Sequence, residues 1–317
     1  MEQQEVVKSA SLWRDAWKRL LKNKLAVFGL VIIVIMTIAV IIGPAIIKWA
    51  TGYTADYIPS EGNLIKSFPP SLQHPMGTDD SGRDILARVL QGGRISLMVG
   101  VISTIVSLIV GVSYGATAGY LGGRIDNFMM RVVDIIYAIP YILLVIVLLS
   151  AFGGANAPEW IKSISSALGS GQGLSQIILL FFALGLVSWL TMARVVRGQI
   201  LSLKNQEFVM AARATGVSTP AIIFRHLVPN ALGPVIVYAT LTIPSVMLSE
   251  AFLSFLGIGV QAPFASWGSL AADGIKNISV FPWQLIFPGV TMALTLFSLN
   301  FLGDGLRDAL DPQTRKF

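Results

Sequence analysis

The sequence predicts an all-α integral membrane protein with six transmembrane helices. Of its 317 residues, 54% are hydrophobic and only 13% are charged, and the mean hydropathy is +0.71. A soluble domain carries about 25% charged residues, so this chain has too few charges to cover a surface that faces water. Six apolar runs are long enough to cross a hydrocarbon core of about 30 Å. We therefore expect one membrane domain.

Residues 1–24 are expected to form a cytosolic amphipathic helix at the membrane surface. Within this stretch, apolar side chains recur at helical spacing on one side, and Arg14, Lys18, Arg19 and Lys22 lie on the other side. This pattern is typical of a basic helix that lies in the plane of the interface and anchors the chain to membrane lipid. The first transmembrane helix follows over 25–47, and it lacks the short apolar core of a cleavable signal peptide.

The remaining chain is divided into an external segment, a membrane core and a short tail. Residues 48–94 are predicted to be external, and their charges at Asp79, Arg83, Asp84 and Arg88 are expected to form local ion pairs and helix caps. Residues 95–303 form the predicted core, and 304–317 form the cytosolic C-terminal tail. The core spans are listed in order: 95–119, 132–152, 177–195, 231–257 and 284–303. Prolines within these spans, at 140, 234 and 244, favour kinks.

The distribution of basic residues predicts the orientation. With six spans and a cytosolic N-terminus, 16 of the 23 Lys and Arg lie in cytosolic segments, and 7 lie in external ones. Positive charge accumulates on the cytosolic side of membrane proteins, so both termini are expected there. The net charge of +6 is explained by this topology, and no nucleic-acid partner is expected.

Two features within the spans invite a structural or a functional interpretation. Gly111, Gly115 and Gly119 recur every four residues, which places them on one helix face and allows close packing against another helix, in this chain or in a partner. Glu250 is an acid near the outer end of the fifth span, where burial of a charge is costly. It is expected either to line a translocation route or to make a structural hydrogen bond. Asp134 is expected to pair with Arg131 one turn earlier.

Catalytic and metal-binding patterns are not found in the sequence. The chain has no cysteine and only two histidines, which excludes disulfides and thiolate metal sites and argues against a metal centre. It contains no P-loop, no HExxH pair and no GxSxG nucleophile elbow. We therefore expect a non-catalytic membrane subunit without a cofactor.

A polar, basic insert over residues 207–230 separates two apolar runs. Glu207 begins a predicted short helix that Gly216 ends, and a second short helix is predicted from Thr219 to Pro229. The small side chains of Ala211 and Ala212 would let another protein approach the backbone closely. From these residues alone, the insert is either a docking hairpin for a soluble partner or a plain solvated loop.

The insert resembles the cytosolic "EAA" loop of ABC-importer permeases. Ala211, Ala212, Gly216 and Pro229 match its fixed positions, whereas Met210 replaces the usual Glu. His226 stands where the peptide-importer branch often carries His. Three further motifs extend the resemblance over nearly the whole chain: HPMGTDDSGRDILARVLQGGRISL, SEAFLSFLGIG and NFLGDGLRDALDP. Together they are similar to the peptide/nickel-type binding-protein-dependent permeases, and most of all to oligopeptide ABC transporter permease C subunits.

This resemblance implies a type I ABC importer permease fold in a bacterial inner membrane, with a coupling loop over 198–229. The implied partners are a second permease subunit, two ATPase subunits that hydrolyse ATP, and an extracytoplasmic peptide-binding protein. The residues expected to couple the ATPases to the spans are listed here: Glu207, Ala211, Ala212, Gly216, Arg225, His226 and Pro229. Oligopeptides are the expected substrate, with dipeptides, nickel or glutathione as alternatives. A secondary transporter and a signalling or structural subunit are the other classes considered.

Overall fold

The computed structural model describes residues 12–58, 67–153, 156–167 and 171–310, and its regular elements there are helices plus one isolated bridge. In chain order the elements are α1 (Leu12–Leu20), α2 (Lys24–Thr51), α3 (Ile85–Leu121), α4 (Gly123–Tyr137), α5 (Tyr141–Phe152), α6 (Glu159–Ala167), α7 (Gly171–Leu203), α8 (Glu207–Ala214), α9 (Thr219–Ala221), the π-helix η2 (Ile222–Leu227), α10 (Val228–Phe255), α11 (Trp267–Ile275) and α12 (Trp283–Leu310). Parts of the predicted N-terminal helix and C-terminal tail, residues 1–11 and 311–317, lie outside the described residues.

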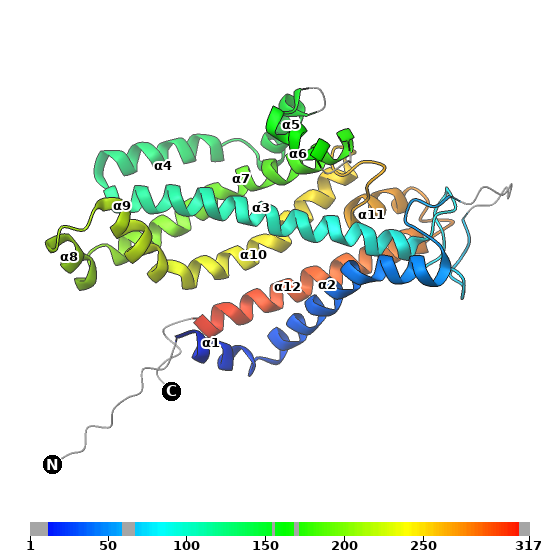
Figure 1. Cartoon of the computed structure of the whole chain (residues 1–317), viewed down its shortest axis with the longest axis horizontal. Coiled ribbons are helices and arrows are strands. Elements are labelled where there is room, and N and C mark those ends of the chain that lie inside the picture. Colours follow the sequence, from blue (N-terminus) through cyan, green and yellow to red (C-terminus); the bar gives the residue numbers. More distant parts are fainter. Residues whose placement is uncertain (1–11, 59–66, 154–155, 168–170, 311–317) are drawn as a thin grey trace, which may run out of the picture.

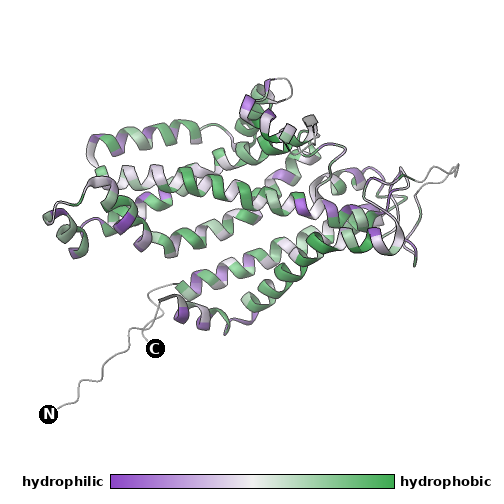
Figure 2. Cartoon of the chain, viewed as in Figure 1, coloured by the Kyte–Doolittle hydropathy of each residue, from purple (hydrophilic) through white to green (hydrophobic). Residues whose placement is uncertain are grey.

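Five of the described helical segments are long and apolar enough to cross a membrane: α2, α3, α7, the continuous α9–η2–α10 segment, and α12. Their apolar character is visible along the bundle in Figure 2. The pair α4 and α5 passes the same test together and supplies the sixth candidate span, but it is bent by 86°. Proline lacks the backbone N–H and restricts the residue before it, so the chain turns at Pro140, just before α5 begins. The predicted kink is confirmed, and it is a sharp break.

The second span is longer than the apolar run that predicted it. Helix α3 begins at Ile85, where the Asp84 side chain accepts a hydrogen bond of 2.8 Å from the backbone N–H of Ala87. The predicted local ion pairs are confirmed, because Asp79 pairs with Arg83 at 2.7 Å and with Arg88 at 2.6 Å. These contacts satisfy the charges of the polar first turns, so the helix extends beyond the hydrophobic stretch.

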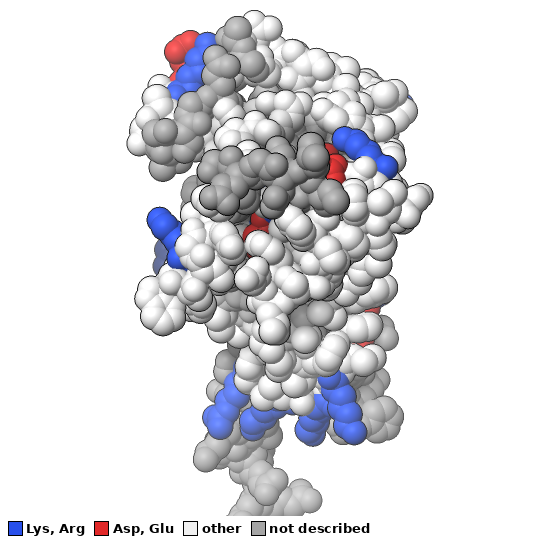
Figure 3. Space-filling model, turned by 90° about the vertical axis from the view of Figure 1, so that its right-hand side faces the viewer, with Lys and Arg blue, Asp and Glu red and all other residues white. Residues whose placement is uncertain are grey.

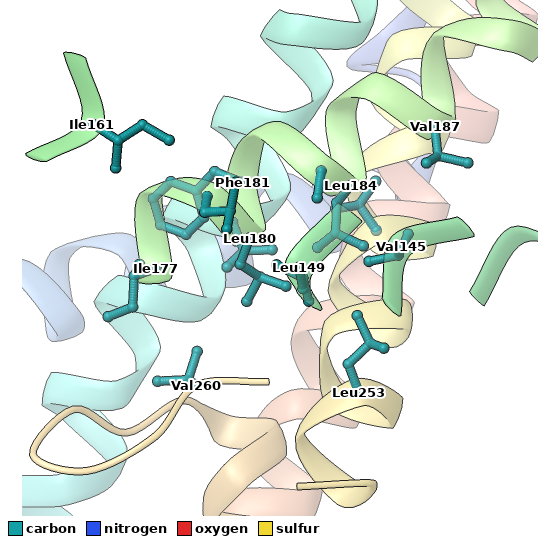
Figure 4. Packing of buried hydrophobic residues seen from close by; sticks show 14 of the residues in the cluster. Val145, Leu149, Ile161, Ile177, Leu180, Phe181, Leu184, Val187, Leu253 and Val260 are labelled. Atoms are coloured by element: carbon teal, nitrogen blue, oxygen red, sulfur yellow. The ribbon is translucent and has the colours of Figure 1, made fainter. Parts of the chain in front are cut away.

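The largest apolar cluster of the described residues packs buried side chains of α3, α4, α5, α6 and α10 around α7. Leu180 and Leu184 of α7 are buried between Val145 of α5 and Leu253 of α10, and Ile161 of α6 belongs to the same cluster (Figure 4). Burying a side chain of this size stabilises the fold by about 1.5 to 3 kcal/mol. The core therefore fixes α7 relative to both halves of the bent span.

The segments with a predicted cytosolic location share one end of the bundle. Figure 1 shows α1, the last turns of α12 and the helices α8 and α9 at its left side, and α11 at the opposite end. Helix α1 is held there because Ala16 and Leu20 are buried against Ala309 of α12. Figure 3 looks at the bundle from the right-hand side of Figure 1 and shows Lys and Arg gathered at its lower edge, the side on which α1 lies.

Candidate functional site

The insert between α7 and α10 begins with a short, well-terminated helix. Helix α8 has Glu207 in its first turn, where a carboxylate is favoured by the helix dipole. Gly216 has a φ of 78°, and its N–H donates to the carbonyl of Arg213 at 3.0 Å. The N–H of Val217 donates to the carbonyl of Ala212, also at 3.0 Å. This pair of bonds forms a Schellman motif, which requires a left-handed residue, so Gly216 ends the helix as predicted.

The second predicted helix differs from the expectation. Its N-cap position is Ser218 rather than Thr219, without a side-chain capping bond, and the helix does not end at Pro229. Instead α9 continues through η2 into α10, and the N–H of Val228 donates to the carbonyl of Ile223 in a wide π turn. The side-chain amide of Asn230 donates to the carbonyl of His226 at 2.6 Å. Proline is tolerated in a membrane helix when such local adjustments satisfy the backbone groups that it frees.

Burial separates the two alanines of α8. Ala212 is 7% exposed and Val209 is fully buried, and both belong to an apolar cluster with Met192 and Ile200 of α7 and Leu227 of η2. Ala211 is exposed on the other side of the helix. Of the pair, Ala211 alone therefore offers a small side chain to a partner, whereas Ala212 holds α8 against its own bundle.

The exposed face of the insert is partly apolar. Phe208 is 38% exposed, Met210 is 53% exposed, and Phe224 of η2 is 51% exposed. Glu207 and Arg225 are also exposed. Exposed aromatic and methionine side chains beside charged ones are typical of a surface that binds another protein.

Polar contacts fix the insert to the ends of the neighbouring helices. Arg213 of α8 donates to the hydroxyl of Tyr120 at 3.2 Å, and its guanidinium lies 5.0 Å from the centre of that ring. Lys204 donates to the carbonyl of Gly119 at 3.2 Å. Arg197 of α7 makes a two-pronged ion pair with Asp126 of α4, at 2.5 and 2.6 Å. These contacts join α8 to the end of α3, and α7 to α4.

The three glycines of the second span face α7 of the same chain. A Cβ atom at Gly111 would lie 2.6 Å from the side chain of Met192, and one at Gly115 would collide with the carbonyl oxygen of Ala193. A Cβ at Gly119 would lie 3.0 Å from the carbonyl oxygen of Arg197. The sequence left the neighbouring helix open, and the structure identifies it.

Two acids within the bundle have defined partners. Glu250 is 1% exposed, and its carboxylate accepts hydrogen bonds from Ser254 at 2.6 Å and from Ser266 at 2.7 Å. It thereby ties α10 to the cap of α11, which matches the structural interpretation. Asp134 accepts from Arg194 of α7 at 2.8 Å, so the expected pair with Arg131 is wrong. The sequence argument considered only neighbours on one helix, whereas a packed neighbour supplied the cation.

The described residues include no cluster of three His, Asp or Glu side chains that could hold a metal ion. The site consists of a partly apolar insert that joins α7 to the continuous α9–η2–α10 segment.

The fold of the chain defines its architectural class. The chain is similar in fold to the inward-facing MetNI methionine ABC transporter, with a TM-score of 0.50 and 17% identity, over 70% of this chain and 96% of that one. A second crystal form gives the same TM-score at 18% identity. The predicted type I permease architecture is thus confirmed.

Sequence comparison then identifies the family. The profile of the binding-protein-dependent transport system inner membrane component matches residues 108–316, and that of the N-terminal TM domain of oligopeptide transport permease C matches residues 11–65. The chain belongs to this permease family, whose members are multi-pass proteins of the bacterial inner membrane. The resemblance drawn from the motifs is confirmed.

Individual relatives match over almost the full length. The oligopeptide transport system permease protein OppC of Escherichia coli K12 is 46% identical over 98% of this chain and 94% of the relative. OppC of Bacillus subtilis is 44% identical over 98% and 92%. The dipeptide transport system permease protein DppC of Bacillus subtilis is 43% identical over 97% and 88%.

Proposed function

We propose that this chain is the permease subunit of an ATP-driven, binding-protein-dependent importer of oligopeptides. The names of relatives that match 98% of the chain at 44% and 46% identity support the substrate class. As a non-catalytic subunit, it would be driven by ATP hydrolysis in partner ATPases. It would pair with a second permease subunit and receive peptide from an extracytoplasmic binding protein.

The observation that carries the proposal is the placement of α8. This helix is short, ends in a Schellman motif, and is held between α7 and the continuous α9–η2–α10 segment. A partner that pushes on α8 would move two membrane helices as rigid bodies, because Val209 and Ala212 pack directly on them. ATP-driven closure of the ATPases would turn the spans outward, and hydrolysis would reset them.

The exposed side of α8 supplies the docking surface in this proposal. Ala211 would allow close approach of the ATPase, while Phe208 and Met210 would fill a groove on it. Glu207 and Arg225 would lie at the rim, where charges orient a partner more than they bind it. Met210 replaces the acid expected from the family pattern, so this position would contribute apolar contact in place of a charge.

Reconstitution in liposomes tests the proposal. The complete complex should take up oligopeptides when ATP is supplied on the side of the membrane that carries the ATPases. Uptake should stop when the ATPases are omitted. Uptake by this chain alone, driven by an ion gradient, would instead identify a secondary transporter. Assembly of the complex without uptake of any tested solute would identify a structural or signalling subunit.

The same preparation resolves the substrate class. Oligopeptides should outcompete dipeptides, nickel and glutathione for ATP-dependent uptake when each is offered with the binding protein. Preference for one of the latter three would keep the permease assignment and correct the substrate.

A further inference from the structure

A groove of about 630 Å³ runs between the bend of α4 and α5, α7 and α10. It is open on one side, since Tyr137 and Ile139 at the bend are 53% and 45% exposed and Ser245 of α10 is also exposed. The volume falls in the range of about 300 to 1,000 Å³ that holds small-molecule ligands.

The lining of this groove carries hydroxyl groups and no ionisable acid, lysine, arginine or histidine. Eight of its sixteen residues are Ser, Thr or Tyr, and the others are apolar. The aliphatic hydroxyls come from both walls: Ser188 and Thr191 from α7, and Thr242, Ser245 and Ser249 from α10. The nearest charges are those of Arg194 and Asp134, which form an ion pair with each other next to Tyr137 and do not belong to the lining.

Most of these aliphatic hydroxyls donate their protons to their own helix. Ser188 donates to the carbonyl of Leu184 at 2.8 Å, and Thr242 donates to that of Tyr238 at 2.8 Å. Ser245 and Ser249 likewise donate to carbonyls one turn earlier, at 3.2 and 2.9 Å. A hydroxyl that has donated its proton keeps acceptor capacity on its oxygen. Tyr141 also hydrogen-bonds with Ser188 and Ser249, and Tyr238 with Thr191 and Thr242, so the acceptor capacity that stays open is greatest at Ser245. The groove therefore offers neutral acceptors, which suit the N–H groups of a peptide backbone.

The two walls are the helices that flank the insert. Helix α7 leads directly to α8, and α10 continues from η2, so both walls are continuous with the insert. Tyr238 and Leu241 also line a second groove of about 380 Å³, which reaches Pro234 and Arg307 toward the end of the bundle that carries α8. The two grooves together extend from the helix bend toward that end.

We propose that this hydroxyl-lined groove is the surface of this chain over which peptide passes, and that its neutrality makes passage indifferent to the charge of peptide side chains. This proposal rests on the proposed function. In a low-dielectric wall a fixed charge would attract one class of peptide and repel the other. Neutral acceptors contact the backbone, which all peptides share.

Substitution of Ser245 by an acidic, a basic and a neutral polar residue tests the proposal by transport. The measured quantity is the ratio of ATP-dependent uptake rates for a lysine-containing and an aspartate-containing peptide of equal length, with the binding protein saturated. The wild-type ratio should be near one. Ser245→Asp should raise the ratio by about tenfold or more, and Ser245→Lys should lower it by a similar factor. Ser245→Asn, whatever its rate, should keep the wild-type ratio.

Unchanged ratios in both charged variants would overturn the proposal, and so would a wild-type ratio far from one. Failure of the wild-type complex to move any peptide would overturn the proposed function instead. A second measurement does not depend on uptake. Because the natural chain has no cysteine, Ser245→Cys introduces its only thiol, and Leu248→Cys is the control on another face of α10, 57% exposed but outside the groove.

Water-soluble cationic and anionic thiol reagents should react with the cysteine at 245 in the assembled complex at rates within about threefold of each other, and at least tenfold faster than with that at 248. Transported peptide should slow the reaction at 245. An unreactive cysteine at 245, or a rate that differs by more than tenfold between the two reagents, would overturn the proposal of a neutral groove over which peptide passes.

Discussion

Replacement of Gly115 by alanine tests the close packing of α3 on α7. A Cβ atom at this position would collide with the backbone carbonyl of Ala193, which has no flexible side chain that could move away. The two helices would have to separate, and overpacking of this kind costs about 1 to 3 kcal/mol. The higher helix propensity of alanine returns less than about 1 kcal/mol. We expect a net loss of about 1 to 2 kcal/mol.

Two further glycines calibrate this prediction. At Gly119 the nearest atoms to a Cβ, in Arg197 and Ile200, lie at 3.0 Å, so Gly119→Ala should cost less than about 1 kcal/mol. At Gly198 of α7 no atom lies within 4 Å of a Cβ. Gly198→Ala should therefore be neutral or slightly stabilising, since only the propensity term remains.

Thermal unfolding of the purified chain in detergent measures the series. The midpoint for Gly115→Ala should fall by about 2 to 5 °C, and that for Gly119→Ala by less. Gly198→Ala should match or exceed the wild type. A Gly115→Ala variant as stable as Gly198→Ala would refute the packing argument, because the two differ only in what the added methyl group meets.

Three other predictions, made with five substitutions, follow from the contacts of the bundle. Ala211→Arg should leave the thermal midpoint of the chain unchanged but abolish co-purification of the ATPases. Ala212→Arg should lower the midpoint itself, because it forces a charge into the apolar cluster at a desolvation cost of several kcal/mol. Equal effects of the two variants would contradict the difference in burial between the two alanines. Asp126→Asn should lower the free energy of unfolding by about 1 to 3 kcal/mol, less than for a fully buried ion pair because the Arg197 side chain is 32% exposed. A thermal midpoint that does not change at low salt would show that the ion pair contributes nothing. Glu250→Gln keeps an oxygen acceptor for its two serine donors and should stay near wild type in stability, whereas Glu250→Leu leaves both donors unsatisfied and should lose about 2 kcal/mol or more; a more stable Leu variant would argue against the structural role.

The architecture could be predicted from the sequence because hydrophobic length and Pro or Gly positions are local signals. Gly216 ended α8 as its left-handed preference requires, and Pro140 broke the third span. The long α3 was underestimated because hydropathy ignores polar residues that pair. Asp84 caps the helix through the N–H of Ala87, and Arg88 lies in its first turns because its partner Asp79 is supplied by the folded external segment.

The sequence predicted which segment forms the candidate docking site, but not which of its side chains are exposed. Ala211 and Ala212 are indistinguishable in the sequence, and the core of the bundle decides which of them is buried. Pro229 looked like a terminator because the π turn that accommodates it leaves no local signature. The groove of hydroxyls was not found, since its residues come from three separated parts of the chain and each is unremarkable alone.

The central claim is that α8 docks on an ATPase and moves the spans it joins. A cysteine at Ala211 of the otherwise cysteine-free chain, treated with a short bifunctional reagent in the assembled complex, tests it most directly. We predict a covalent adduct with an ATPase subunit that changes in yield when ATP is added, and no adduct from a cysteine at the buried Ala212. The account would be contradicted if the cysteine at position 211 formed no ATPase adduct in any nucleotide state and reacted with lipid-soluble reagents as fast as with water-soluble ones.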